Sequence, residues 1–265
     1  MIIKKNLVSV LITLYNEEKY IIQSLTSLIN QSYNYWEAVI IDDASTDNTL
    51  KIIKKNFKDK RIKIFKLNKH IGRTPAINYG FKKCNGTFVA ILDADDLYAK
   101  NKLEKQIEFL KKKPNIKLLA SWVYLIKENK SIIKYKASKG YIKIRNELLF
   151  KNIIAFSSVI FNKTFAIKNN FFPLKLSYAQ DYELILKFLK FSKLYILPNF
   201  LCKIQIRSNN MSNNPKNKMI NIKDGLICLN YVKNNFNLNL KEKFFFIKSK
   251  FKIYLKIFLI KLRIF

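Results

Sequence analysis

Glycine, proline, cysteine and histidine are all scarce in this chain of 265 residues, which has five glycines, five prolines, three cysteines and one histidine. The glycines cannot supply a GxxxxGK[ST] or GxGxxG motif, which excludes a glycine-rich loop that holds phosphate. The cysteines are widely separated, so they give no zinc-binding spacing and suit a reducing compartment. No apolar run approaches the roughly 18 residues that a membrane-spanning helix needs. A small-residue cleavage site is also missing after the first apolar run, so we expect a strand there and not a signal peptide.

Acidic side chains are scarce as well, because 50 lysines and arginines face only 18 aspartates and glutamates, a formal net charge of +32. Lys, Asn, Ile, Phe and Tyr are all abundant, which is typical of an AT-rich genome, so much of this charge is expected to be solvated surface. The rest of the positive charge predicts attraction to anions such as nucleotides, nucleic acid or an anionic membrane. Against this background, Asp93, Asp95 and Asp96 lie within four positions at the end of an apolar run.

Apolar runs alternate with helical patterns in the first half of the chain. The pattern predicts strands at residues 7–14, 36–41, 61–67 and 87–92, with helices at 16–32, 45–57, 72–84 and 100–113. We expect Asn16 to cap the first helix, with Glu17 and Glu18 in its first turn. The alternation predicts an α/β fold with a parallel sheet and right-handed crossovers.

Ligands of such a sheet bind beyond the carboxyl ends of its strands. Three motifs fall there: Thr13–Tyr15, Asp42-Asp43 and Asp93–Asp96. The second half is less regular, with strands predicted at 117–126, 132–136 and 156–161, a helix at 179–191, an extended run at 194–206 and helical structure from about residue 216.

The Asp-x-Asp at the end of the fourth predicted strand is suited to a divalent cation that grips a diphosphate. Mg²⁺ and Mn²⁺ take carboxylate and water ligands, and a buried carboxylate cluster without a cation would suffer like-charge repulsion. The alternative is that these aspartates only cap the following helix.

Two segments, VSVLITLYNEEKYIIQSLTSLINQSYNYWEAVIIDDASTDNTL and KHIGRTPAINYGFKKCNGTFVAILDADD, resemble the nucleotide-binding half of family 2 glycosyltransferases. The resemblance implies a GT-A fold, a Rossmann-like α/β/α sandwich with a mostly parallel central sheet, which here carries a helical C-terminal extension. It implies transfer of a sugar from a nucleoside-diphosphate sugar, expected to be UDP-linked, with inversion at the anomeric carbon. The implied acceptor is a hydroxyl of a glycan or a lipid-linked glycan in surface polysaccharide assembly, and the implied cofactor is Mg²⁺ or Mn²⁺.

The resemblance also assigns roles by position. The residues expected to bind the nucleotide-sugar are Thr13, Tyr15, Glu17, Asp42, Asp43, Arg73, Asp93, Ala94, Asp95 and Arg207. Asp43 is expected to bond the base, and Asp95 with Asp96 to hold the metal. From their own chemistry, Thr13 and Tyr15 could equally serve packing at the strand end, and Arg73 could be a surface residue.

The resemblance places the catalytic base at Asp181, where the acidic pair usual in the family becomes Gln180-Asp181. Asp181 would take the proton of the acceptor hydroxyl, whereas the alternative role is a helix N-cap. Many members of the family carry a stretch like Tyr-Arg-x-His before Asn-Asn-x-Ser, and this chain has IQIRSNNMS there. Gln205 therefore stands in place of the Arg, and Arg207 in place of the His. Arg207 cannot bind a metal, but its guanidinium can hold a diphosphate. His70 is expected to serve its own loop.

The C-terminal segment KEKFFFIKSKFKIYLKIFLIKLRIF carries Lys248, Lys252 and Lys256 at four-residue steps, with Phe246 and the isoleucines largely elsewhere. This pattern predicts a helix on an anionic bilayer surface, or equally a helix packed on the catalytic domain or a dimer partner. We therefore expect a catalytic domain at 1–215, with a nucleotide-sugar-binding half at 1–100 and an acceptor-side half at 101–215, and a basic amphipathic helical tail at 216–265. The enzyme would be cytoplasmic and peripheral on the inner face of the membrane.

The sequence disfavours two other classes of function. A sugar nucleotidyltransferase would need a glycine-rich, basic loop after the first strand, where this chain has TLYNEE. A nucleic-acid-binding module would cluster its basic residues in a stripe with aromatic residues, whereas these lysines occur in every segment. We therefore expect no nucleic-acid partner.

Overall fold

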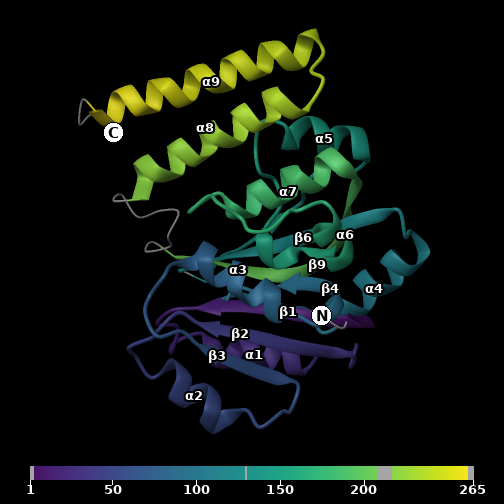
Figure 1. Ribbon diagram of the computed structural model, residues 1–265, viewed down its shortest axis with the longest axis vertical. Helices are drawn as coiled ribbons and strands as arrows, with labels where there is room; N and C mark the ends of the chain where they lie inside the picture. Colours follow the sequence, from purple (N-terminus) through teal and green to yellow (C-terminus); the bar gives the residue numbers. More distant parts are fainter. Residues whose placement is uncertain (1–2, 129, 208–216, 262–265) are drawn as a thin grey trace.

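The computed structural model describes residues 3–128, 130–207 and 217–261 (Figure 1). Its centre is one mixed sheet with the strand order β3-β2-β1-β4-β8-β6-β9-β5, and β7 pairs with β6. The strands are β1 (Lys4–Leu14), β2 (Trp36–Asp42), β3 (Ile62–Lys66), β4 (Gly86–Ile91), β5 (Leu97–Tyr98), β6 (Ile116–Lys127), β7 (Ile132–Tyr135), β8 (Ile160–Asn162) and β9 (Lys193–Ile206). Helices cover both faces of this sheet, so the predicted α/β/α sandwich is confirmed.

The parallel half of the sheet follows the sequence pattern closely. β1 lies between β2 and β4, and β2 pairs with β3, all in parallel. The apolar runs are continuous because successive side chains of a strand point to opposite faces, and here both faces are buried. Helices α1 (Ile21–Ile29), α2 (Thr49–Asn56) and α4 (Lys102–Lys112) cover one face, and α3 (Arg73–Lys83) covers the other.

The predicted start of the first helix is wrong. α1 begins at Ile21, and no acidic residue lies in its first turn. Asn16 has a positive φ of 57°, and its Oδ1 accepts a hydrogen bond of 2.9 Å from the Thr46 N–H. Glu18 likewise accepts from the Asn48 N–H at 2.9 Å. Both side chains are used to fix the loop before α2, which is why they do not begin α1.

The second half of the sheet adds antiparallel pairings. β8 pairs antiparallel with both β4 and β6, while β6 and β9 are parallel. The strand predicted at 156–161 is only partly present, because Phe156–Ser158 form a 3₁₀ helix, η1. Ser158 closes this turn, since its N–H and its hydroxyl both donate to the Ala155 carbonyl. Two further helices, α5 (Tyr141–Leu148) and α6 (Lys163–Lys168), were not predicted.

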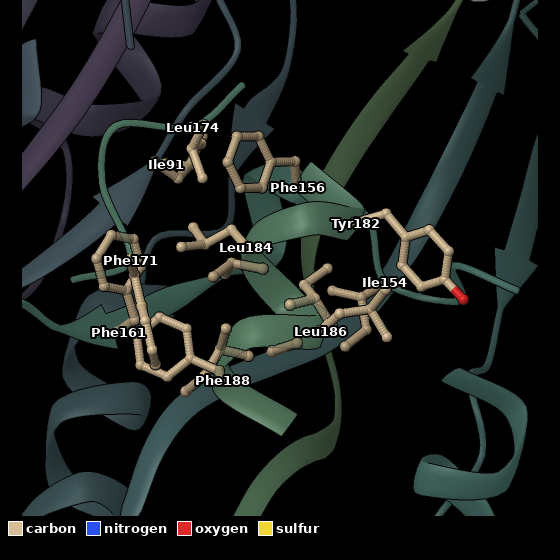
Figure 2. Close-up of a cluster of buried hydrophobic side chains, with 14 of the residues drawn as sticks. Ile91, Ile154, Phe156, Phe161, Phe171, Leu174, Tyr182, Leu184, Leu186 and Phe188 are labelled. Carbon is tan, nitrogen blue, oxygen red and sulfur yellow. The ribbon is translucent and has the colours of Figure 1, made fainter. Parts of the chain in front are cut away.

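Helix α7 (Gln180–Phe191) is buried against the second face of the sheet, in the larger of two apolar clusters (Figure 2). The ring of Phe188 lies 5.4 Å from that of Phe161 and 4.8 Å from that of Phe171. The Tyr182 hydroxyl donates to the Leu148 carbonyl at 2.6 Å. These contacts fix the direction of α7, and with it the position of its first turn.

The C-terminal helices α8 (Lys218–Asn235) and α9 (Leu240–Lys261) form an antiparallel pair at the outer edge of the molecule (Figure 1). Cys228 and Val232 of α8 belong to the larger cluster, and Asp224 accepts a hydrogen bond of 2.8 Å from the Tyr178 N–H. The domain boundary predicted at residue 215 falls outside the described residues and stays a prediction. Among the described helices, none is both long enough and apolar enough to cross a membrane.

Candidate active site

A cavity of about 850 Å³ opens beyond the carboxyl ends of β1, β2 and β4. Its lining contains the predicted residues Thr13, Tyr15, Glu17, Asp43, Arg73, Asp93, Ala94, Asp95, Asp96, Asp181 and Arg207. Asp42 is the exception: it does not line the cavity, and its buried Oδ1 accepts from the Ser45 N–H at 3.2 Å. Asp42 is the last residue of β2, and its carboxylate orders the start of the loop that follows this strand.

One end of the cavity is formed by aromatic rings and a tightly held turn. The rings of Tyr15 and His70 lie 4.0 Å apart between centroids. Asp43 accepts from the N–H groups of Ile71 and Gly72, each at 2.8 Å, and lies 2.9 Å from His70 Nδ1. Gly72 has a φ of 90°, a conformation that favours glycine. Asp43 thus orders the turn that leads into α3, and His70 serves this loop as predicted.

Two arginines neutralise the carboxylates of the Asp-x-Asp. Arg73 Nη2 lies 2.5 Å from Asp93 Oδ1, and Arg207 Nη2 lies 2.5 Å from Asp95 Oδ2. Arg207 also donates to both oxygens of Glu17, at 3.1 and 3.2 Å. Burial raises the pKa of Glu17 and of Asp95, and the charge of Arg207 offsets part of that rise. The cavity therefore brings cationic guanidinium groups and carboxylates together in a half-buried place.

Asp96 lies deeper than its two neighbours. It accepts from the Ser157 hydroxyl at 2.5 Å and from the Gln205 N–H at 3.0 Å, so it joins η1 to β9. Burial, and then the charges of Asp93 and Asp95, raise the pKa of Asp96 well above its ordinary value.

Carboxylates on the cavity wall are the candidate ligands for the implied metal. No group of three or more potential Asp, Glu, His or Cys ligands occurs in the part of the chain that the structure describes. Mg²⁺, however, usually binds one or two carboxylates together with waters and substrate phosphates. Asp93 and Asp95 provide such a pair on the cavity wall, so the residues fit a cation shared with a diphosphate. Both oxygens of Asp96 already accept hydrogen bonds, which makes Asp95 the better placed of the two predicted ligands.

Asp181 lies in the first turn of α7 and lines the cavity. Its Oδ2 accepts a hydrogen bond of 2.8 Å from Asn152 Nδ2. Burial raises the pKa of Asp181 to about 6, despite the hydrogen bond from the Tyr182 N–H and the charge of Arg73. A carboxylate with this pKa is suited to take a proton near neutral pH. The capping alternative is wrong, because the N-cap of α7 is Ala179.

Gln180 contacts Arg73 even though it replaces an acidic residue of the family pattern. With its amide oriented to satisfy both groups, Gln180 accepts from Arg73 Nε at 3.1 Å and donates to the Ser177 carbonyl at 3.2 Å. A neutral amide at this position adds no like charge beside Asp181.

The family model described as Glycosyl transferase family 2 matches residues 9–169. The chain belongs to this family. It is 33% identical over 212 residues to an Escherichia coli relative, the UDP-Glc:alpha-D-GlcNAc-diphosphoundecaprenol beta-1,3-glucosyltransferase WfgD, a match that covers 78% of this chain and 80% of WfgD. The family assignment confirms that the protein is a glycosyltransferase, and it favours glycosyl transfer over the nucleotidyltransferase and nucleic-acid-binding alternatives.

Two solved structures share the fold of this glycosyltransferase. Staphylococcus aureus TarS 1–349, in complex with UDP-GlcNAc, has a TM-score of 0.73 and 22% identity, over 89% of this chain and 69% of that one. The mannosyltransferase PcManGT from Pyrobaculum calidifontis, in complex with GDP-Man and Mn²⁺, has a TM-score of 0.66 and 17% identity, over 94% of this chain and 70% of that one. They confirm the predicted GT-A architecture.

Asn152 and Ser157 of the glycosyltransferase were not predicted from the sequence. They lie before and within η1, in the irregular second half, where no periodic pattern places them near the cavity. Ser157 accepts from the Asp93 N–H at 3.0 Å while donating to Asp96, so it orders the Asp-x-Asp turn. Residues 208–212 of the segment IQIRSNNMS lie outside the described residues.

Replacing Asn152 with alanine should raise the pH at which activity is lost on the acid side. Asn152 donates to a charged form of Asp181, and a hydrogen bond to a charged group is worth about 1.5–3 kcal/mol, which corresponds to a shift of the acid limb by about one to two pH units. The pH profile of kcat/KM measures this. The matched control is Asn230→Ala, an exposed asparagine on α8. An acid limb that does not move in Asn152→Ala would show that Asn152 does not position Asp181.

Proposed function

We propose that this glycosyltransferase transfers a sugar from a UDP-sugar to a hydroxyl of a lipid-linked glycan, with inversion, during surface polysaccharide assembly. The observation that carries the proposal is that one cavity is lined both by Asp181, a carboxylate with a pKa of about 6, and by an Asp-x-Asp whose carboxylates pair with guanidinium groups. The names of WfgD and TarS connect similar chains with UDP-sugars, and that of WfgD with a lipid-diphosphate acceptor.

The proposed reaction is a single displacement. Asp181 takes the proton of the acceptor hydroxyl while the oxygen of that hydroxyl bonds to the anomeric carbon. The bond from that carbon to the diphosphate oxygen breaks on the opposite face, and its electron pair leaves with UDP. One displacement of this kind inverts the configuration. The raised pKa of Asp181 makes it a stronger base than an ordinary aspartate, while it is still mostly ionised at pH 7.

The leaving diphosphate would be stabilised by the cationic groups on the cavity wall. Arg73 and Arg207 offer planar guanidinium groups, which match phosphate oxygens with two parallel hydrogen bonds. Asp95, with Asp93, would hold Mg²⁺ or Mn²⁺, which supplies further charge stabilisation to a departing diphosphate when bound. Arg207 stands where relatives often carry histidine, so here a fixed positive charge would take over the phosphate contact.

The nucleoside would lie at the aromatic end of the cavity. The rings of Tyr15 and His70 offer a face for stacking, and Tyr15 is 41% exposed. Asp43 holds the adjacent turn and keeps its carboxylate on the cavity wall, where it can also accept from a base N–H. A lipid-linked acceptor would place the enzyme at the inner face of the cell membrane, on the cytoplasmic side.

A donor screen tests this proposal. The full chain is incubated with UDP-, GDP- and dTDP-sugars, with Mn²⁺ or with a chelator, and hydrolysis of the donor is measured together with UDP binding by calorimetry. We expect hydrolysis of a UDP-sugar that depends on Mn²⁺. A preference for GDP- or dTDP-sugars would overturn the donor assignment. Tight, salt-sensitive DNA binding without any UDP binding would overturn the enzymatic one.

A further inference from the structure

Helix α9 uses one face to pack on the protein. Phe246 is buried, and Ile253 and Ile257 are partly buried. Glu242 is buried and forms an ion pair with Arg145 of α5. This face contacts α8 and α5, in agreement with the predicted packing of the tail on the catalytic domain. Most of the apolar residues of α9 lie outside this face.

The opposite face of α9 is apolar and exposed, and we call it the outer stripe. It consists of Leu240, Phe244, Ile247, Phe251, Tyr254, Leu255 and Phe258. Apart from the adjacent pair Tyr254 and Leu255, these residues recur every three or four positions, so they share one side of the helix. Each is between 45% and 85% exposed. Single exposed apolar side chains are ordinary on a protein surface, whereas a continuous stripe of large ones marks an interaction site.

Lysines border the outer stripe on both sides. At about 100° per residue, Lys241, Lys248, Lys252 and Lys256 lie along one side, and Lys243 and Lys250 along the other. The one acidic residue between Leu240 and Lys261 is Glu242, and it is turned inward to Arg145. The exposed surface of α9 therefore combines an apolar centre, two cationic borders and no negative charge.

We propose that the outer stripe and its lysine borders bind the surface of an anionic lipid bilayer, with α9 lying in the plane of the interface. Large apolar side chains enter the boundary between headgroups and acyl chains, and lysines on either side meet the lipid phosphates. A second copy of the chain fits less well, because pairing two stripes would bring rows of lysines together. The charge of the borders thus favours lipid over self-association.

The outer stripe also suggests how the enzyme reaches a lipid-linked acceptor, and this one step rests on the proposed function. Asn217, directly before α8, lines the cavity. Since α8 and α9 are antiparallel, α9 returns toward the same side of the molecule (Figure 1). The C-terminal end of α9 therefore lies beside the start of α8, the end of that helix nearest Asn217 and the cavity wall. The binding of α9 to lipid does not itself depend on the reaction.

Vesicle co-sedimentation of the full chain tests the proposal. We expect binding to vesicles of phosphatidylcholine with phosphatidylglycerol, and much weaker binding to phosphatidylcholine alone. Replacing Phe244, Phe251 and Phe258 together with serine should lower the partition coefficient by roughly 100-fold or more, because three large apolar side chains are removed from the interface. The matched control replaces three exposed isoleucines outside α9, Ile132, Ile142 and Ile167, with serine. It should leave the partition coefficient unchanged.

A second pair of variants separates the stripe from the general positive charge of the chain. Replacing Lys248, Lys252 and Lys256 with glutamine should weaken binding about five-fold for each lysine. The control removes the same charge from α2, at exposed Lys51, Lys54 and Lys55, and should have little effect. Circular dichroism and UDP binding verify that each variant is folded.

Four outcomes would overturn the proposal. One is wild-type protein that does not bind anionic vesicles, and a second is serine variants that still bind them. The third is an equal loss of binding in both lysine sets, which would show attraction to the whole basic surface. The fourth is a dimer that the three serines dissociate without any effect on vesicle binding. Hydrolysis of the donor without acceptor or vesicles should be unchanged in all variants, so failure here is distinct from failure of the proposed function.

Discussion

Replacing Asp181 with asparagine should abolish sugar transfer and leave donor binding intact. The amide has the size of the carboxylate, and its oxygen can still accept from Asn152, but it cannot take the proton of the acceptor. Loss of a general base typically costs about 10²–10⁴-fold in rate. Transfer to an acceptor is measured alongside UDP binding by calorimetry. The matched control is Glu183→Gln, in the same helical turn but outside the cavity lining.

The pH dependence of the wild-type enzyme tests the same assignment independently. A carboxyl group with a pKa of about 6 retains its proton to a higher pH than an ordinary aspartate, so the base is lost as the pH falls through 6. We expect kcat/KM to decline about ten-fold for each pH unit below this point and to be level above it. Unchanged turnover in Asp181→Asn, or an acid limb near pH 4, would remove Asp181 from the role of base.

Replacing Asp95 with asparagine should produce the second large effect, on the response to metal. The amide keeps a hydrogen-bond acceptor beside Arg207 but loses the negative charge that would hold a cation. Removing one group that stabilises charge in a transition state costs roughly 10²–10³-fold in rate. The measurement is UDP affinity and donor hydrolysis in Mn²⁺ and in a chelator. We expect the difference between these two conditions to vanish in the variant.

Asp96→Asn provides the comparison for Asp95. Asp96 is buried between Ser157 and the Gln205 N–H, so its replacement should mainly change the melting temperature. If Asp96→Asn removes the response to Mn²⁺ without changing the melting temperature, Asp96 is the ligand. If the wild-type enzyme binds UDP equally well with and without metal, neither aspartate holds a cation in the complex, and the contacts of Arg207 would be sufficient.

The sequence by itself determined which carboxylates lie at the edge of the sheet. Asp43, Asp93 and Asp95 follow runs whose length and apolar character predict buried parallel strands, and the carboxyl ends of parallel strands meet at one edge. This inference needs only local pattern and a general property of the architecture. It therefore held for the first half of the chain, and it was less accurate at 156–161, where the Ser158 hydroxyl donates to the Ala155 carbonyl and a turn replaces the first part of the predicted strand.

Only the tertiary structure decided which partners those carboxylates have. Arg207 reaches Glu17 across 190 positions of sequence, and Asn152 reaches Asp181 from a separate loop. Such pairs arise from the packing of β9 and α7 in the folded protein, and no local period encodes them. The tertiary structure also decided which face of α9 is buried, because the sequence alone showed rows of apolar residues and rows of lysines without saying which row packs on the protein. Packing of α9 on the rest of the protein buried Phe246 and left Phe251 exposed, because only one face of a helix can contact its neighbours.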